Sequence, residues 1–123
     1  METTDDLKIK FTLRPYADIN DLLHSIFWKN PDVVPVARKF LMYVMEWGKS
    51  GSPHKADEWQ SYCNKMDLTQ SRYHNMLKRL KRAGMIKKTY NKNLGVHEYH
   101  ISDGFSSQID RMMKTWDDFC SKK

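Results

Sequence analysis

Residues 68–86 read LTQSRYHNMLKRLKRAGMI and contain the most complete helix signal in the chain. Thr69 is a good N-cap residue, and Leu68 and Tyr73 occupy the two positions of a hydrophobic staple around it. Gly84 suits the left-handed position that ends a helix, and Met85 is then placed to pack on the last turn. Between these ends, four apolar residues recur at helical spacing: Tyr73, Met76, Leu77 and Leu80. The stretch therefore predicts an amphipathic helix with one buried face.

The other face of this helix is polar and basic. Helical geometry turns Ser71, Asn75, Lys78 and Arg82 away from the apolar side, with Arg72, His74 and Arg79 flanking them. No acidic residue occurs between Asp67 and Glu98, whereas eight Lys and Arg do; the rest of the chain has 13 basic and 15 acidic residues and nets −2. Such a basic segment is typical of proteins that bind nucleic acid. The alternative is an ordinary solvated face, although such faces usually mix charges of both signs.

Periodicity and turn residues predict elements on both sides of the basic helix. After the basic helix, two stretches typical of strands are joined by a segment that contains Asn and Gly, and this arrangement predicts a β-hairpin. Apolar residues at helical spacing, together with caps and breakers, predict the helices. The expected elements are a strand over 7–13, helices over 18–27, 35–47 and 56–66, the basic helix, hairpin strands over 86–90 and 96–101, and a C-terminal helix over 105–120.

The order of two helices, a basic helix and a hairpin between about residues 35 and 102 resembles the winged helix-turn-helix. Within it, residues 68–86 are similar to a pattern of MarR-like and PadR-like regulators: a polar cap, an amphipathic helix, Leu, two residues, Ala-Gly, then Met-Ile. The resemblance implies a mainly α chain with a small β-hairpin (α+β). We expect a single domain with an N-terminal strand-helix extension (1–31), a winged-helix core (32–103) and a C-terminal helix (104–123).

The resemblance also implies sequence-specific binding of double-stranded DNA by a transcriptional regulator. The forked side chains of Arg72 and Asn75 match the base edges of guanine and adenine, so these two residues are candidates for base contact. Arg72 could instead pair with Asp57 or Glu58, and Asn75 could simply be solvated. Ser71 and His74 are the remaining candidates for DNA contact on the basic helix. On the same helix, phosphate contacts are expected for Lys78, Arg79 and Arg82. In the wing, the candidates for DNA contact are Lys88, Lys92 and Asn93.

The C-terminal helix carries a long apolar stripe that needs a cover. Its members are Phe105, Ile109, Met112, Met113, Trp116, Phe119 and Cys120. Either the N-terminal strand and helix of the same chain or the same helix of a second copy could cover this stripe. We expect a homodimer, because a two-fold pair places two basic helices on successive major grooves, roughly 34 Å apart.

Other classes of function lack a signal. The longest apolar run, Phe40–Met45, is far shorter than the roughly 20 residues that cross a bilayer, and the acidic start Met1–Asp6 is unlike a secretory signal. We therefore expect a cytoplasmic protein with no membrane partner. His97 and His100 fall on opposite faces of a strand, and Cys63 and Cys120 read as buried apolar residues. Neither a metal site, a cofactor nor a catalytic constellation is expected. Whether a small-molecule effector binds stays open, because the Trp and Met residues could line a ligand pocket or equally pack in the core.

The competing hypothesis is a winged helix that docks proteins within a transcription or replication assembly. Fold alone does not separate these two functions. The acid-free segment favours nucleic acid, because protein docking does not require it.

Overall fold

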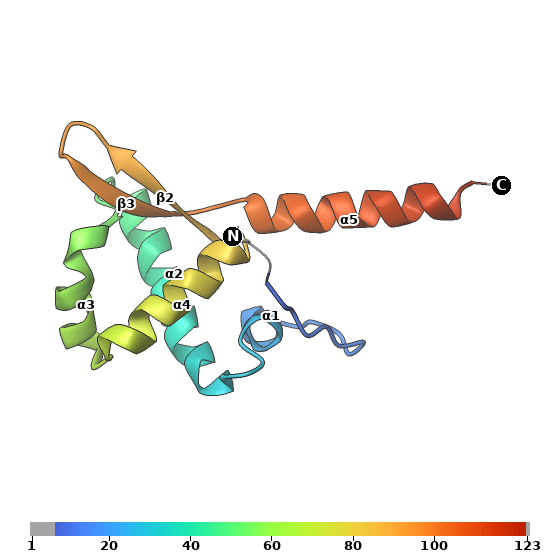
Figure 1. Ribbon diagram of the computed structural model, residues 1–123, viewed down its shortest axis with the longest axis horizontal. Helices are drawn as coiled ribbons and strands as arrows, with labels where there is room; N and C mark the ends of the chain where they lie inside the picture. Colours follow the sequence, from blue (N-terminus) through green and yellow to red (C-terminus); the bar gives the residue numbers. More distant parts are fainter. Residues whose placement is uncertain (1–6, 123) are drawn as a thin grey trace, which may run out of the picture.

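The computed structural model describes residues 7–122, which form five α-helices and one three-stranded antiparallel sheet (Figure 1). The α+β class expected from the sequence is confirmed. Residues 1–6, which include the acidic start, and residue 123 lie outside the described range. The elements in chain order are α1 (Ile19–Ile26), η1 (Pro31–Val33), α2 (Val34–Lys49), β1 (His54–Lys55), η2 (Ala56–Glu58), α3 (Trp59–Met66), α4 (Gln70–Arg82), β2 (Ile86–Asn91), β3 (Val96–Ile101) and α5 (Gly104–Cys120).

The core lies where α2, α3, α4 and the sheet meet. Phe40 of α2 is fully buried, and its ring makes edge contacts with Tyr62 of α3 at 5.4 Å and with Tyr73 of α4 at 5.9 Å between centroids. On the other side of α2, α1 contributes the fully buried Leu23 and Ile26. Aromatic rings at such distances add to the stability gained from burying their area. The aromatic centre thus fixes how α3 and α4 cross α2.

Both ends of α4 form as the sequence predicts. The Thr69 hydroxyl accepts a hydrogen bond from the Arg72 amide at 3.1 Å. At the other end, the Met85 amide donates to the Leu80 carbonyl and the Gly84 amide to the Lys81 carbonyl, both at 3.0 Å. Gly84 has φ = +81°, so this is the left-handed termination that glycine favours. All four predicted apolar positions of α4 are buried.

The sheet has the order β1-β3-β2, with the predicted hairpin strands β2 and β3 paired from Ile86↔Ile101 to Asn91↔Val96. The third strand, β1, was not expected from the sequence. It contains only two residues, of which His54 lies opposite Tyr99, and two residues are too few to show an alternating pattern. β1 nevertheless ties the connection between α2 and α3 to the hairpin.

The predicted strand over 7–13 is wrong. No described residue in this segment is part of a strand, and its alternation is only half realised: Leu7 and Ile9 are partly buried, whereas Phe11 and Leu13 are exposed. A strand needs a neighbour to receive its hydrogen bonds. Here the Lys10 amide bonds to the Ser25 carbonyl at the end of α1, so the segment runs against a helix instead of a sheet.

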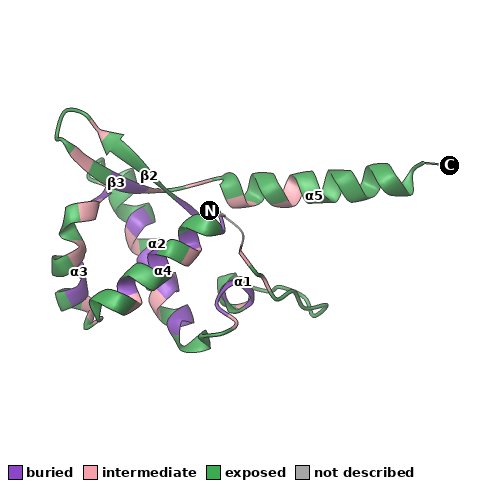
Figure 2. Ribbon diagram, viewed as in Figure 1, coloured by how far each residue is buried: buried purple, intermediate pink, exposed green. Residues whose placement is uncertain are grey.

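The C-terminal helix α5 extends away from the rest of the chain (Figure 1), and none of its residues is buried (Figure 2). Cys120 is therefore exposed, contrary to the expectation of a buried residue, while Cys63 is buried as expected. The error has a simple cause, since helical spacing places Cys120 on the apolar stripe but the outer half of that stripe packs on no other element within residues 7–122. Within residues 7–122, no helix combines the length and apolar character needed to cross a bilayer.

Candidate nucleic-acid interface

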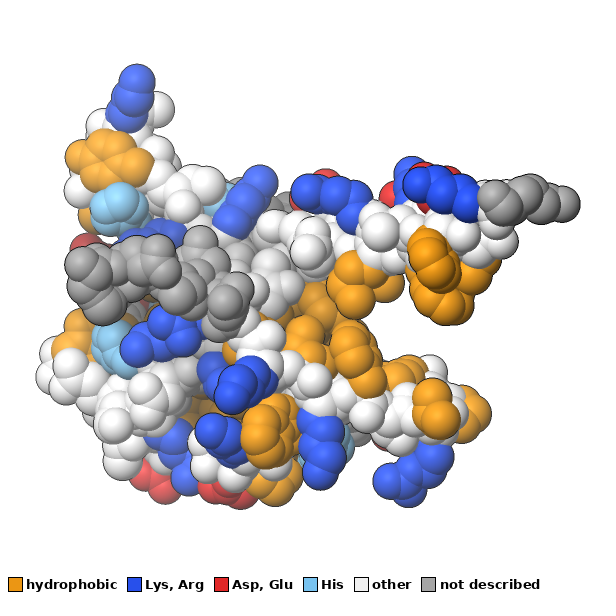
Figure 3. Space-filling model, turned by 45° about the vertical axis from the view of Figure 1, so that its right-hand side comes forward, with side chains coloured by type: hydrophobic (Ala, Val, Ile, Leu, Met, Phe, Trp, Pro, Cys, Tyr) orange, Lys and Arg blue, Asp and Glu red, His pale blue; other side chains and the backbone are white. Residues whose placement is uncertain are grey.

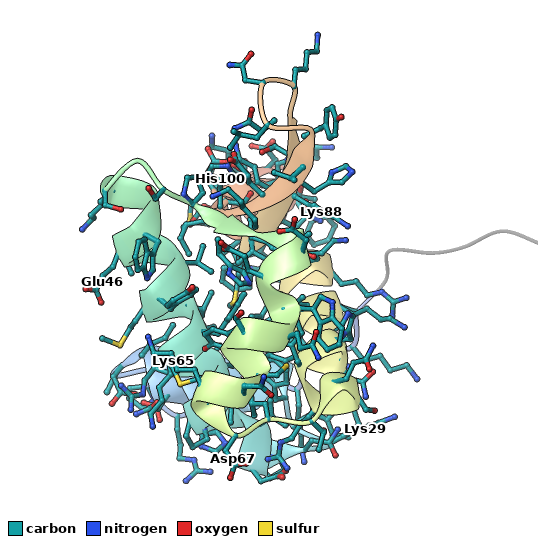
Figure 4. The ribbon with its side chains drawn as sticks, turned by 90° about the vertical axis from the view of Figure 1, so that its left-hand side faces the viewer. Lys29, Glu46, Lys65, Asp67, Lys88 and His100 are labelled. Carbon is teal, nitrogen blue, oxygen red and sulfur yellow. The ribbon has the colours of Figure 1, made fainter. Side chains whose placement is uncertain are left out.

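A groove of about 640 Å³ separates α4 from the hairpin, and its lining is mostly cationic. The residues that line it are His74, Leu77, Lys78, Lys81 and Arg82 of α4, with Lys88 of β2 and Tyr99 of β3. We refer to this surface as the basic groove. Its α4 side chains are exposed apart from Leu77, and Figure 4 shows the Lys88 side chain on the side of the molecule where α4 lies.

Among residues 7–122, no acidic side chain lines the basic groove. Glu98, the acidic residue that ends the basic segment, is buried on β3 next to Tyr99, and adjacent residues in a strand point to opposite faces. Its carboxylate accepts a hydrogen bond from the Asn91 amide group at 2.9 Å and lies 3.5 Å from Nε2 of His100. Lys88 stands over the Tyr99 ring at 5.9 Å. The positive charge of the groove is thus uncompensated among the residues around it.

Arg72 makes contacts within the chain. Its guanidinium lies 2.7 Å from the Asp32 carboxylate and also donates to the Asp32 main-chain oxygen at 3.3 Å. The partner is therefore a residue of η1, and not Asp57 or Glu58 of η2. A contact with guanine would require Arg72 to leave this ion pair. The structure gives Arg72 a role in positioning α4 against the connection between α1 and α2.

Arg79 is also held by main-chain atoms. Its Nε donates to the Ile26 carbonyl at 3.0 Å, and its Nη2 donates to the Lys8 carbonyl at 3.2 Å. Ile26 is the last residue of α1, so a cation here also suits the negative end of that helix. Burial lowers the pKa of the Arg79 guanidinium, with the nearby Arg82 as a second cause. Arg79 thus fastens α4 to the N-terminal extension and is less available to a phosphate.

Between these two arginines and the basic groove lies the outward face of α4. Ser71 and Asn75 are exposed on it, and the structure shows no side-chain hydrogen bond for either within residues 7–122. Asn75 borders a shallow pocket of about 170 Å³ that is shared with Arg72, Arg79 and the segment 27–33. The remaining candidates, Lys92 and Asn93, are exposed at the hairpin tip, where Asn91 accepts hydrogen bonds from the amides of residues 93 and 94.

Two residues of this region were missed by the sequence analysis. Lys81 was counted in the basic segment but was not assigned to a site, although it lines the basic groove. His54 is fully buried, and its Nε2 lies 2.7 Å from the Tyr73 hydroxyl, so it links β1 to α4. Burial lowers the pKa of this imidazole, opposed by the nearby Glu58. A single histidine in a two-residue strand gives no sequence pattern that could reveal this role.

The apolar stripe of α5 forms a second surface without a cover. The exposed fraction is 53% for Met113, 63% for Trp116 and 68% for Phe119, while Phe105 and Ile109 near the start of the helix are partly buried. Leu7 and Ile9 of the N-terminal extension reach only this first part, where they line a pocket with Phe105, Ile109 and Met112. The extension therefore covers the beginning of the stripe and leaves its outer half exposed.

An apolar groove of about 430 Å³ lies beside the start of α5. Most of its lining comes from Ile19, Leu22, Leu41, Met42, Met45, Met85, Ile101 and Phe105, and we refer to it as the apolar groove. Figure 3 shows hydrophobic side chains on both sides of the hollow under α5. Within residues 7–122 there is no group of three or more His, Cys, Asp or Glu side chains arranged to hold a metal ion.

Comparison with known proteins places the chain in a family. A family model described as "Archaeal family" matches residues 14–120, which include every helix and strand described above. The chain belongs to this archaeal family. No curated protein and no solved structure matches it.

Proposed function

We propose that this member of the archaeal family is a winged-helix protein that binds double-stranded DNA and regulates transcription, without catalysing a reaction. The observation that carries the proposal is the basic groove, because its cations lie together on one exposed surface and none of the described residues that line it is acidic. A charged surface of this kind attracts the phosphate backbone, whose neutralisation releases counterions.

The arrangement of elements supports the winged-helix interpretation. The core elements follow one another in the order of helix, strand, two helices and two strands, namely α2, β1, α3, α4, β2 and β3. β1 pairs with the outer edge of β3 in the hairpin. α4 has an exposed face that is polar and basic and the helix contains no acidic residue, so it serves as the recognition helix, and the hairpin serves as the wing. A helix of this size fits the major groove, which is roughly 12 Å wide.

The geometry also suits different residues of α4 to different contacts with DNA. Asn75 and Ser71 face outward and are free to meet base edges, where Asn suits adenine. In the basic groove, phosphates are bound by Lys78, Lys81, Arg82 and Lys88, and His74 lines the same groove. Lys92 and Asn93 extend this surface at the tip of the wing. Arg72 and Arg79 position α4 through their bonds to Asp32, Ile26 and Lys8, which is a different role from the expected contacts with DNA.

The partner of the α5 stripe in this proposal is a second copy of the chain. The Phe105 amide donates to the Gly84 carbonyl at 2.9 Å, so α5 starts pressed against the turn that ends α4 and is directed away from its own apolar groove. The exposed apolar side chains of the stripe and of the apolar groove supply the surface for a two-fold contact. A stable interface of standard size buries about 1,600 Å² in total.

A salt series on duplex DNA tests the proposed function. We expect the wild-type chain to bind a mixed-sequence duplex tightly at low salt, with affinity that falls steeply between about 50 and 200 mM salt as counterion release requires. Changing Lys78, Lys81 and Arg82 to Ala should flatten the slope by about 0.9 log unit for each phosphate that is no longer neutralised. Absence of duplex binding by the wild type at low salt would reject the proposal and favour the protein-docking alternative.

A further inference from the structure

A helix that lies in the major groove has a phosphate backbone on each side of it, because the groove is bounded by both strands. In this chain one flank of α4 is the basic groove. The other flank carries Arg72 and Arg79, whose guanidinium groups are already bonded to Asp32 and to main-chain carbonyls. On that second flank α4 itself therefore offers little free positive charge to the second strand.

The N-terminal extension lies on this second flank. Arg79 of α4 donates to the Lys8 carbonyl, and the Trp28 indole Nε1 donates to the same oxygen at 3.0 Å. The Lys10 amide is fixed in turn on the Ser25 carbonyl at 3.0 Å. These bonds use main-chain atoms of the two lysines. The extension is thus held against α4 while the lysine side chains remain exposed to solvent.

Trp28 is linked to three lysines of the extension, because its indole bonds to the Lys8 carbonyl, it lines a pocket with Lys10, and Lys29 lies over its ring. Lys8 and Lys10 are exposed in the segment that precedes α1, and Lys29 follows α1 with its Nζ 5.3 Å from the centre of the Trp28 ring. Figure 4 shows Lys29 near one end of α4 and Lys88 near the other, on the same side of the molecule. We name Lys8, Lys10, Trp28 and Lys29 the arm surface.

Asp21 lines a pocket with Lys10 and Trp28, and the described acidic residues of this region are bonded to groups other than the three lysines. Asp18 caps α1 by accepting the Asp21 amide, Asp21 accepts the Ala17 amide, and Asp32 is paired with Arg72. No salt bridge involves Lys8, Lys10 or Lys29 within residues 7–122. Three exposed lysines close to one another in the fold are a composition that suits a phosphate backbone.

We propose that the arm surface is a second nucleic-acid contact, which binds the phosphates of the strand on the side of α4 opposite the wing. The N-terminal extension thereby becomes part of the interface, and Arg79 acts as the residue that positions it. This inference rests on the proposed function, since it concerns the same duplex that α4 and the wing bind.

The test compares two triple variants of the full chain with equal changes in charge. One replaces Lys8, Lys10 and Lys29 with Ala, and the other replaces Lys39, Lys49 and Lys65, which are exposed on α2 and α3. Figure 4 shows Lys65 on the opposite side of the view from Lys29 and Lys88. The probe is a mixed-sequence DNA duplex, and binding is measured by fluorescence anisotropy over a series of KCl concentrations.

We expect the arm variant to bind at least about tenfold more weakly at about 0.1 M salt, with a salt slope lower by about 2.7 log units per decade because three phosphates are no longer neutralised. The control variant should keep the wild-type slope to within about 0.9 log unit per decade, the value for one phosphate. Both variants should unfold at the wild-type temperature, because none of the six side chains is buried.

The outcomes separate this inference from the function on which it rests. Wild-type affinity and slope in the arm variant, together with weakened binding after the changes at Lys78, Lys81 and Arg82, would overturn the arm surface and leave the proposed function standing. Equal losses in the arm and control variants would also overturn it, because only net charge would then matter. If the wild-type chain does not bind the duplex at low salt, both proposals fail.

Discussion

The helices α4 and α5 are both amphipathic, yet they stand in opposite relations to the rest of the chain. The apolar face of α4 is completely buried, with Tyr73 at 1% and Leu80 at 0% exposure. The apolar face of α5 is a comparable stripe, but no residue of that helix is buried. The contrast is visible in Figure 2, where buried residues appear on α4 and are absent from α5.

This difference shows that an apolar stripe at helical spacing can indicate two different kinds of packing. In α4 the pattern specifies packing within the chain, and the polar face that remains is free to bind a ligand. In α5 it specifies an apolar stripe whose outer half is left exposed by residues 7–122, and such surfaces mark contacts with other molecules. The Gly84–Phe105 contact joins the two helices, so the position of α5 depends on how α4 ends.

The largest expected effect separates the two helices by stability. Leu80→Ala should lower the free energy of unfolding by about 2–5 kcal/mol, because it leaves a cavity in a fully buried site. Met113→Ala removes an exposed side chain and should change it by less than about 0.5 kcal/mol in the monomer. Urea denaturation at a concentration where the chain is monomeric measures both values. Similar losses in the two variants would mean that α5 packs on its own chain.

A second prediction concerns association. Trp116→Asp places a charge in the exposed apolar stripe and should raise the dimer dissociation constant at least about 100-fold, or about 2.7 kcal/mol. Ser107→Asp is the matched control, because it adds the same charge on the polar side of α5. Analytical ultracentrifugation at micromolar concentration gives the masses. A wild-type mass near that of one chain would reject the homodimer and leave the stripe to another partner.

The junction between the two helices gives a third prediction. In Gly84→Ala the new Cβ would lie 2.8 Å from the Phe105 nitrogen, and the residue would keep φ = +81°. We expect a loss of about 1–3 kcal/mol in the free energy of unfolding, from strain at this position. Gly48→Ala is the control, since no atom lies within 4 Å of its Cβ and the site is helical. That change should stabilise the chain by up to about 1 kcal/mol.

An unchanged stability in Gly84→Ala would indicate that α5 can separate from the turn after α4. The direction of α5 would then no longer be determined by this contact, and its stripe could reach the apolar groove of the same chain.

Features that depend on residues close together in the sequence were predictable, whereas features that depend on distant residues were not. Local signals predicted both ends of α4, its buried face and the hairpin, because caps, helical spacing and turn residues act within a few positions. The strand expected over 7–13 was wrong because its alternating pattern does not say whether a neighbouring strand exists. β1 was missed because two residues are too few to show an alternating pattern of apolar and polar side chains.

The candidate site shows the same limit. Spacing placed Lys78 and Arg82 on the exposed face of α4, where they line the basic groove. It could not show that Arg72 would meet Asp32, 40 residues earlier, or that Arg79 would meet Ile26, 53 residues earlier. Such contacts depend on how α1 and η1 pack on α4. Charge on a helix face is therefore readable from the sequence, whereas its availability to a ligand is not.

The smallest effect in this series concerns the attachment of α4 to the sheet through His54. The imidazole is buried beside the Tyr73 hydroxyl, and burial holds its pKa below the ordinary value of 6.5. The unfolded chain therefore binds more protons than the folded chain just below about pH 6.5. The free energy of unfolding should be independent of this group above about pH 6.5 and should fall as the pH decreases below it, by about 1.4 kcal/mol for each unit of pKa difference.

Urea denaturation between about pH 5 and 8 measures the dependence, and His54→Phe should remove this part of it. His97→Gln, at an exposed position of β3, is the control for removing a histidine from the sheet. Identical pH profiles for His54→Phe and the wild type would show that His54 does not titrate differently in the folded chain, and the link between β1 and α4 would then be insensitive to pH.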